Sequence, residues 1–297
     1  MAQVQAALAD RYRIEGPIGH GGMAVVFRAR RTDGADPVAV KVMRPELGYE
    51  DGVVERFGIE ALAMGQLHHE NIVEVRAHGE AGKVLWIEMQ LIDGEPLDRL
   101  LRNGPLDWRR AARLLGQAAS ALAYAHGAGV IHRDIKPANL LVAAGSDRLL
   151  IGDFGIAKIV GASRLTATGT TVGTPAYMSP EQFAFDREVT AATDQYSLGV
   201  VAWQMITGTV PPAADSDDWR GWTRSSSRRI RSQAPDCPSA FVTLIARMIA
   251  VDPDARWPDL AFVSRAALEI ASTGHATSIP IPTSRSRVSA ALKALLG

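Results

Sequence analysis

Glycines in the run 19–24, Gly-His-Gly-Gly-Met-Ala, could bring the backbone close to a phosphate group. Glycine has no side chain to block that approach, and the amide N–H groups of such a loop are free to bind an anion. Glycines between two strands, however, more often mark only a tight hairpin. A strand and not a helix follows the run, which disfavours a dinucleotide-binding turn.

Lys41 follows the apolar run Val-Ala-Val at 38–40, so its ammonium must either extend to solvent or meet an anion. Extension to solvent is the commoner outcome for a lone lysine. Glu60 weighs against it, because this carboxylate stands among apolar residues of a helical segment where a surface charge is out of place. An ion pair between Lys41 and Glu60 would hold the ammonium beneath the glycine run.

Five polar residues stand at fixed spacing in the run 132–139, His-Arg-Asp-Ile-Lys-Pro-Ala-Asn. Pro137 prevents the run from continuing as a helix. A solvated loop could carry these charges, but the apolar residues on both sides predict a loop with buried flanks. The tripeptide Asp153-Phe154-Gly155 follows after one pair of strands. Its position after this loop is not explained by chance.

The segments that must position these groups divide the chain into a strand-rich part and a helical part. The first has one helix at 53–68 and strands at 13–19, 23–30, 37–43, 72–78 and 84–91. The second has helices at 108–126, capped by Asp107, at 194–207, ended by Gly208, and at 239–250. The span 130–190 is mostly loop, which is uncommon unless the loop is functional. Two such parts predict a ligand between them.

The composition is that of an ordinary globular protein, with 47% hydrophobic residues in 297. Lys plus Arg and Asp plus Glu both total 32, and a neutral balance argues against a protein built mainly to bind nucleic acid. The single cysteine, Cys237, cannot form an internal disulfide, and a small packed residue is the favoured interpretation. The sequence contains no apolar run long enough to span a bilayer and starts with no signal peptide, so we expect a cytoplasmic protein.

In this order the motifs resemble those of eukaryotic-type Ser/Thr protein kinases, bacterial branch, over about residues 11–270. The runs 173–181, 194–199 and 252–256 resemble the end of the activation segment, the start of the central helix and the late arginine motif of that family. Three positions depart from the family pattern: Ala24, Gln90 and Ser179 replace the usual Gly, Glu and Ala. The resemblance implies an α+β bilobal kinase fold, with a small sheet-rich N-lobe that carries one long helix and a larger helical C-lobe.

The same resemblance implies a role for each matching residue in transferring the γ-phosphoryl group of ATP to Ser or Thr of proteins. Asp134 would accept or orient the substrate hydroxyl proton, and Lys136 would neutralise the transferred group. Lys41, held by Glu60, would bind the α- and β-phosphates. Asn139 and Asp153 would hold Mg²⁺ or Mn²⁺, which prefer such oxygen ligands. The residues implied to contact ATP are Ile18, Gly19, His20, Gly21, Gly22, Met23, Ala24, Val26, Ala39, Lys41, Met89, Gln90, Leu91 and Leu141.

The resemblance also implies a platform for protein substrates and a regulatory loop. Thr174 would favour a small hydroxyl acceptor, and Glu181 would pair with Arg256. Arg133 would pair with a phosphate on the activation loop, for which Thr166 and Thr168 are the candidate autophosphorylation sites. His132, Phe154 and Met64 would stack inside the protein. The basic run 224–231 is interpreted as a solvated loop and not as a docking patch.

Three alternatives remain beside an active protein kinase. A pseudokinase typically lacks one of Lys41, Asp134, Asn139 and Asp153, which are all present. The activation-segment motifs disfavour a small-molecule kinase, and nothing independent supports a pure interaction module. We expect protein substrates, a homodimer for trans-autophosphorylation, no nucleic acid and no membrane segment. The predicted organisation is an extension at 1–10, a kinase domain at 11–270 with lobes at about 11–90 and 94–270, and a flexible tail at 271–297.

Overall fold

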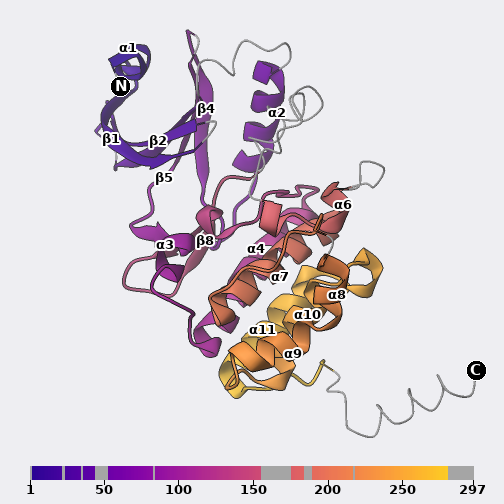
Figure 1. Cartoon of the computed structure of the whole chain (residues 1–297). Coiled ribbons are helices and arrows are strands. Elements are labelled where there is room, and N and C mark those ends of the chain that lie inside the picture. Colours follow the sequence, from indigo (N-terminus) through magenta and orange to yellow (C-terminus); the bar gives the residue numbers. More distant parts are fainter. Residues whose placement is uncertain are drawn as a thin grey trace, which may run out of the picture.

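The computed structural model describes residues 2–21, 24–34, 36–43, 53–82, 84–154, 175–183, 189–216 and 218–279, without the side chains of residues 2, 53, 56, 60 and 220. The described residues form a small lobe built on a sheet and a larger lobe built of helices (Figure 1). The observed fold is thus the α+β bilobal arrangement that the sequence predicts.

The small lobe contains a five-stranded antiparallel sheet in the order β1-β2-β3-β5-β4. Its strands are β1 (Tyr12–His20), β2 (Ala24–Arg31), β3 (Val38–Met43), β4 (Val75–Ala81) and β5 (Val84–Gln90), and its helices are α1 (Ala2–Leu8) and α2 (Val53–Gly65). The helix predicted at 53–68 therefore ends three residues early. The strand predicted at 72–78 begins at Val75, because Ile72 forms only an isolated bridge with Ile151.

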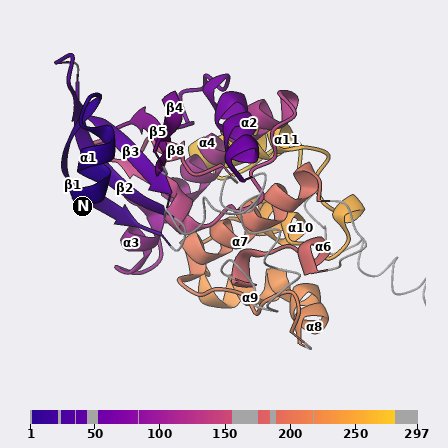
Figure 2. The same ribbon diagram turned by 90° about the horizontal axis from the view of Figure 1, so that it is seen from above.

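Both faces of this sheet are covered, because side chains alternate between the faces along each strand. Ala39, Ile87 and Met89 face the core that continues into the large lobe. Phe27 and Trp86 belong to a second core cluster, which Leu8 of α1 joins at 1% exposure. Figure 2 shows α1 lying against β1 and β2. The predicted extension 1–10 is therefore largely a helix packed on the lobe.

The large lobe is organised around the long helix α4 (Trp108–Gly127). As predicted, Asp107 caps this helix, and its Oδ1 accepts the amide N–H of Arg109 at 2.9 Å. The other elements of this lobe are β6 (Gly94–Pro96), α3 (Leu97–Leu101), β7 (Leu140–Ala143), β8 (Leu149–Ile151), α6 (Pro180–Phe183), α7 (Ala191–Thr207), α8 (Trp219–Arg224), α9 (Ser226–Gln233), α10 (Ser239–Met248) and α11 (Leu260–Thr273).

Small residues let the helices of the large lobe approach closely. The Ser264 hydroxyl of α11 donates a hydrogen bond to the carbonyl of Gly116 in the middle of α4, at 2.8 Å. Gly208 ends α7 in the left-handed conformation with a φ of 72°, as predicted. This helix begins at Ala191 and not at Asp194, because the Thr190 hydroxyl caps it.

Two parts of the large lobe are more ordered than the sequence suggested. The basic run 224–231, interpreted as a solvated loop, lies mostly within α9. The buried side chain of Ile230 fixes that helix to the lobe. At the carboxyl end, α11 extends to Thr273, and Ile279 is 3% exposed. Residues 280–297 of the predicted tail lie outside the described residues.

Candidate active site

The loop 132–139 is held in place by one buried carboxylate of α7. Asp194 is fully buried, and its two oxygens accept the amide N–H groups of His132 at 2.8 Å and Arg133 at 2.7 Å. His126 Nε2 lies 2.8 Å from Asp194 Oδ2. Arg133 has a φ of 65°, a strained conformation for a residue other than glycine, so the loop depends on these bonds.

His132 links this loop to the segment that ends at Asp153. The His132 ring is buried and contacts Phe154, with 4.7 Å between ring centroids. The amide of Asp134 donates to His132 Nδ1 at 3.2 Å, and Nε2 lies 3.0 Å from the Gly152 carbonyl. Only a neutral ring with its proton on Nε2 satisfies both bonds. Burial agrees with this state, because it lowers the pKa of His132 despite nearby acidic groups.

Asp134, Lys136 and Asn139 converge on one point of the loop. The Lys136 ammonium donates to Asp134 Oδ2 at 2.8 Å. The Asn139 amide nitrogen donates to the Asp134 carbonyl at 2.8 Å and to Oδ2 at 3.2 Å. The Asn139 side-chain oxygen is therefore turned away from Asp134 and is available to another group. The carbonyl of Asn139 accepts the amide of Gly152 at 2.9 Å, which ties the loop to the residue before Asp153.

Lys41 and Asp153 bring the two lobes together. Lys41 is 7% exposed on β3, and its Nζ lies 2.8 Å from Asp153 Oδ1. Removal from water disfavours the charge on Asp153, but the ammonium outweighs that effect and lowers the pKa of the carboxyl group. The lysine therefore meets an anion instead of extending to solvent. The predicted partner, Glu60, has its backbone in α2, and its side chain lies outside the described residues.

Sheet register aligns the residues predicted to contact ATP. Gly19 pairs with Val26, and Val26 pairs with Lys41, so these three lie side by side across β1, β2 and β3. Residues directly opposite in an antiparallel sheet share a face. On the same face of β3, Ala39 lies opposite Met89. Ile18 is 51% exposed, whereas Ala39 and Met89 are buried.

The remaining residues predicted to contact ATP divide by location. His20 and Ala24 lie at the ends of β1 and β2 that flank the glycine run, and Gly21 between them donates its amide to the Ala24 carbonyl at 2.8 Å. Gln90 ends β5, Leu91 follows it in the linker between lobes, and Leu141 pairs with Pro96. Gly22 and Met23 lie outside the described residues, as do Gly155, Thr166, Thr168 and Thr174.

The pair that the sequence predicts between Glu181 and Arg256 is present and buried. Arg256 Nη1 and Nη2 lie 2.7 Å and 2.8 Å from the two carboxylate oxygens of Glu181. The Thr193 hydroxyl donates to Glu181 Oε1 at 3.1 Å, and Arg256 Nη1 also donates to the Ala192 carbonyl. Burial disfavours the carboxylate, but the guanidinium lowers the pKa of Glu181 on balance. The pair therefore joins α6 to the segment before α11.

The side chains of Asp153 and Asn139 suit a cation that a bound ligand also coordinates. Among the described residues, no group of three or more His, Cys, Asp or Glu side chains could hold a metal. Asp153 and Asn139 offer only oxygen atoms and are too few to surround a cation. Mg²⁺ is commonly bound in this way, by one or two protein groups together with phosphates and water. Soft metals are not favoured by such a set.

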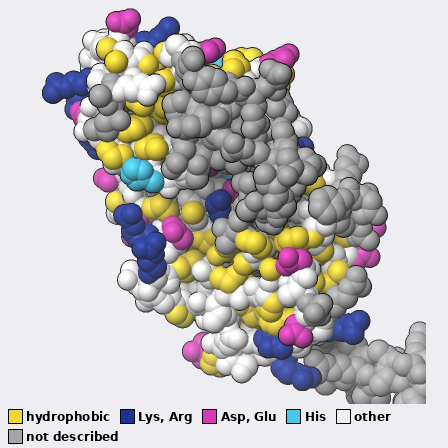
Figure 3. Space-filling view, turned by 45° about the horizontal axis from the view of Figure 1, so that its top comes forward, with side chains coloured by type: hydrophobic (Ala, Val, Ile, Leu, Met, Phe, Trp, Pro, Cys, Tyr) yellow, Lys and Arg dark blue, Asp and Glu magenta, His cyan; other side chains and the backbone are white. Residues whose placement is uncertain are grey.

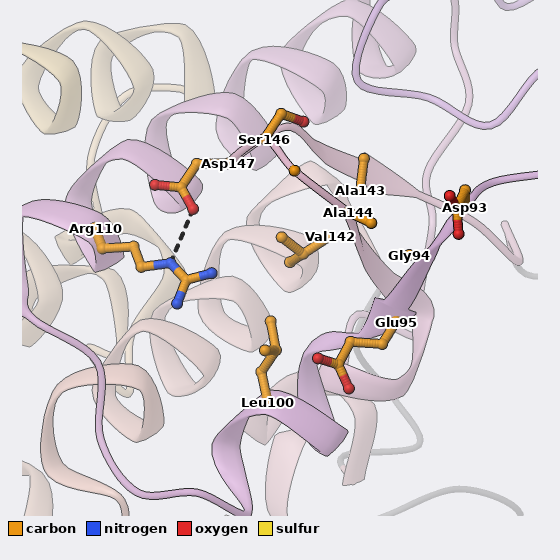
Figure 4. A pocket seen from close by; sticks show the side chains of 11 residues that line it. Asp93, Gly94, Glu95, Leu100, Arg110, Val142, Ala143, Ala144, Ser146 and Asp147 are labelled. Atoms are coloured by element: carbon orange, nitrogen blue, oxygen red, sulfur yellow. Dashed lines mark hydrogen bonds and ion pairs between the residues drawn. The ribbon is translucent and has the colours of Figure 1, made fainter.

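A separate cavity of about 670 Å³ lies behind the linker between the lobes. Its walls include Glu95 of β6, Leu100 of α3 and Val142 of β7 (Figure 4). Asp147 at its rim is held by Arg110 through an Nε–Oδ1 contact of 3.0 Å. None of the residues predicted to bind ATP or metal lines this cavity.

The surface of the helical lobe carries side chains of different types in different places. Figure 3 shows hydrophobic side chains in a band across the helical lobe, with acidic and basic side chains around it.

Cys237 is buried, and burial raises the pKa of its thiol to about 12, so the interpretation of this residue as a packed side chain holds.

Comparison with known proteins identifies the family. The family model described as "Protein kinase domain" matches residues 12–265. The chain belongs to the protein kinase family. This confirms the resemblance on which the residue roles rest, and the match covers nearly the whole predicted kinase domain.

Curated relatives of this kinase domain carry the name serine/threonine-protein kinase. PknJ of Mycobacterium tuberculosis is 38% identical over 283 residues, which are 92% of this chain and 47% of PknJ. PknA of the same organism is 36% identical over 255 residues, which are 84% of this chain and 58% of PknA. The chain thus spans about half the length of the curated relatives it matches.

Solved structures give the same family and fold. The crystal structure of the M. tuberculosis PknI kinase domain matches with a TM-score of 0.70 and 25% identity, covering 87% of this chain and 95% of that one. Proteins of this family use ATP and a divalent metal. Among the described residues, no helix is long and apolar enough to cross a bilayer.

Sequence reasoning missed two residues that position this site. It placed Asp194 at the start of a helix, but not as the acceptor that holds the loop 132–139. It also assigned no role to His126, whose ring contacts Asp194. A usable signal existed for Asp194, because an acidic side chain early in an apolar helix is costly to bury unless it accepts hydrogen bonds.

Proposed function

We propose that this kinase domain is catalytically active and transfers the γ-phosphoryl group of ATP to Ser or Thr side chains of proteins. The observation that carries the proposal is the convergence of Lys41 with Asp153 and of Lys136 and Asn139 with Asp134. Loss of any of these groups would favour a scaffold without transfer. The names of the curated relatives support Ser/Thr as acceptors.

Each residue has a role that follows from its chemistry. The Asp134 carboxylate accepts or orients the proton of the acceptor hydroxyl, since it stands on the loop with its second oxygen free of the Lys136 bond. Lys136 and Lys41 place positive charge where phosphate oxygens would carry negative charge. Bound ATP supplies the phosphoryl group, and a divalent cation neutralises its phosphates.

The cation in this proposal is Mg²⁺, with Mn²⁺ as a substitute of the same ligand preference. Asp153 and Asn139 would hold it, because a carboxylate and an amide oxygen suit a hard cation. The Lys41 ammonium lies 2.8 Å from Asp153 Oδ1, so both side chains reach the same part of the site. Lys41 would bind phosphate oxygens of ATP there, and Asp153 would hold the cation.

The proposal extends to regulation, assembly and location. Arg133 is exposed next to Asp134, which supports pairing with a phosphate on the activation loop. Thr166 and Thr168 stay the candidate autophosphorylation sites. Trans-autophosphorylation in a homodimer, the absence of nucleic acid among the partners and a cytoplasmic location also stay predictions.

A transfer assay tests the proposal. Purified protein is incubated with γ-labelled ATP and Mg²⁺, alone and with a generic protein substrate, and labelled residues are mapped by mass spectrometry. We expect label on Ser and Thr, lost in Asp134→Asn and in the absence of Mg²⁺. Transfer by Asp134→Asn at close to the wild-type rate would contradict the role of Asp134. Binding of ATP without any transfer by the wild-type protein would instead support a pseudokinase.

A further inference from the structure

Helices α8 and α9 carry a strongly basic surface that the proposed function does not use. The segment 219–233 contains five arginines and no Asp, Glu or Lys. Four of them have described side chains, all of them exposed: Arg224, Arg228, Arg229 and Arg231. We refer to these four residues as the arginine surface. Arg224 is the last residue of α8, and the other three lie within α9.

The charges of the arginine surface are not neutralised within the described part of the chain. No described carboxylate forms an ion pair with any of the four, although Asp215 and Asp218 precede α8 directly. Arg229 alone has local contacts, with the Ser225 hydroxyl at 3.0 Å from its Nε and the Trp222 ring at 5.8 Å. Four exposed like charges within eight residues favour an anionic partner.

A continuous stack of side chains joins this surface to the substrate platform. The Arg256 guanidinium that binds Glu181 also lies 5.1 Å from the Tyr196 ring. The Tyr196 ring contacts Trp219 at 5.6 Å, and Trp219 stacks on Trp222 at 5.7 Å. Trp222 in turn contacts Arg229. A relay of side-chain contacts thus connects the arginine surface with the Glu181–Arg256 pair within the same lobe.

The described contacts favour a protein partner over an anionic membrane. A helix that lies on a membrane needs an apolar face to insert. In α9 the only large apolar side chain is Ile230, which is fully buried inside the lobe. Arginine presents a planar fork that binds carboxylates and phosphates through two bonds, and it is enriched with tryptophan at protein interfaces. Half-buried Trp222 beside Arg229 supplies that combination.

We propose that the arginine surface of α8 and α9 docks an acidic segment of the protein substrate during phosphorylation. The proposal rests on the proposed kinase function and assigns it a substrate class, proteins with an acidic stretch separate from the acceptor. The chain as a whole is neutral, so this attraction is local to the surface. Docking raises the local concentration of the acceptor at the platform, and its effect appears in KM.

The test compares two synthetic peptides with the same Thr acceptor and the same flexible linker, one ending in eight Glu and the other in eight Gln. The wild-type protein should phosphorylate the Glu-tailed peptide with at least a 10-fold higher kcat/KM at low salt, through KM. In Arg224→Gln/Arg228→Gln/Arg231→Gln this ratio should fall to about 1, with the rate on the Gln-tailed peptide unchanged. Arg229 is retained because it contacts Trp222. Raising ionic strength should also lower the ratio, because salt screens exposed charges.

Arg148→Gln/Arg265→Gln is the matched control, since it removes two exposed arginines on other elements of the large lobe. It should keep the wild-type ratio. An equal loss in this control, or an unchanged ratio in the triple variant, would overturn the proposal. The proposal would also be overturned if the wild-type protein showed no preference between the two peptides but bound phosphatidylserine vesicles through the same three arginines. That result would assign the surface to a membrane.

A binding measurement separates this proposal from the proposed function. A fluorescent peptide of eight Glu without Ser or Thr should bind the wild-type protein at least 10-fold more tightly than the triple variant, by anisotropy. This binding needs no phosphoryl transfer. If the protein proves inactive on both acceptor peptides, the proposed function fails while docking is still measured. If transfer occurs but the acidic peptide binds both proteins equally, docking alone is wrong.

Discussion

Lys41 and Asp153 form an ion pair of 2.8 Å across the two lobes, although 112 residues separate them in the sequence. The contact joins the lysine proposed to bind phosphate to the carboxylate proposed to bind metal. Each charge thereby neutralises the other. Phosphates would offer Lys41 an anionic partner and a cation would offer Asp153 a positive one, so neither charge would be uncompensated in the proposed complex.

Lys41→Met should abolish transfer without unfolding the protein. Removal of a single group that stabilises transition-state charge commonly costs ~10²- to 10³-fold in rate, and we expect a loss of at least that size in kcat/KM. The methionine keeps most of the apolar stem that packs against the sheet. Steady-state kinetics with a Thr peptide, together with thermal unfolding, measure both effects. A variant that keeps more than a tenth of wild-type kcat/KM would contradict the role of Lys41.

His132 should make the protein less stable below neutral pH. Burial lowers the pKa of this ring, so between the lowered value and its ordinary value of ~6.5 the unfolded chain binds a proton that the folded protein does not. The free energy of unfolding must therefore fall as the pH decreases through 6.5. Protonation would also place an N–H on Nδ1, facing the amide N–H of Asp134.

Urea unfolding between pH 5.5 and 7.5 tests this dependence on His132. In His132→Phe, which keeps the ring contact with Phe154, the slope of stability against pH should become smaller. His69 also has a pKa lowered by burial and contributes with the same sign, so His69→Gln provides the comparison. An identical slope in wild type and His132→Phe would show that His132 does not carry the effect.

Most of the active site could be predicted from sequence, because its residues belong to short runs with strict order. Asp134, Lys136 and Asn139 stand within six residues, and the loop geometry that gathers them is local. The pairing of Glu181 with Arg256 was also predicted, through family resemblance. The order of the motifs does not show which of several oppositely charged side chains form ion pairs with one another. Lys41 contacts Asp153, a pairing that the sequence analysis did not name, and its predicted pairing with Glu60 stays a prediction because the Glu60 side chain lies outside the described residues.

The elements that could not be predicted from the sequence are those whose formation depends on tertiary packing. The periodic helices at α4, α7 and α10 were predicted within three residues of their ends. Helix α1 is only seven residues long, too short to be stable alone, and it forms because Leu8 packs under the sheet. In α9 four polar or charged residues precede Ile230, so the pattern resembles a loop until burial of Ile230 is known.

Arg256→Ala should strongly destabilise the large lobe. Both side chains of the Glu181–Arg256 pair are buried, and removal of one partner leaves a buried charge without compensation. We expect a loss of about 3–5 kcal/mol in the free energy of unfolding, measured in urea. Arg256→Lys should recover only part of it, because an ammonium cannot form both bonds to the carboxylate at once. Full stability in Arg256→Lys would argue against the importance of the paired geometry.

Asp194→Asn should loosen the catalytic loop. The amide has the same shape, but its NH₂ group must face either the amide of His132 or that of Arg133, each of which now donates to a carboxylate oxygen. A buried donor without an acceptor costs about 1–3 kcal/mol, which is the expected loss of stability. Because Arg133 is strained, kcat should also fall by at least 10-fold. Thr190→Ala, which removes only the cap of the same helix, is the control and should leave kcat within 2-fold.

Gly199 and Gly58 provide opposite outcomes for the same substitution in two helices. A Cβ at Gly199 in α7 would lie 2.7 Å from Met248 Cβ and 2.9 Å from Ile249 Cγ2, whereas a Cβ at Gly58 in α2 would meet no atom of the described residues within 4 Å. Met248 Cβ is fixed to its backbone, so α10 itself must move to admit the new atom. Overpacking of this kind costs about 1–3 kcal/mol, which exceeds the gain in helix propensity.

Gly199→Ala should therefore lower the free energy of unfolding, and Gly58→Ala should raise it by about 0.5–1 kcal/mol because alanine restricts the unfolded chain and favours helix. Urea unfolding of both variants beside wild type measures the two signs in one experiment. A gain at Gly199 would mean that α7 and α10 are less closely packed than the structure places them. A loss at Gly58 would mean that α2 meets a neighbour on that face, where the structure leaves open space.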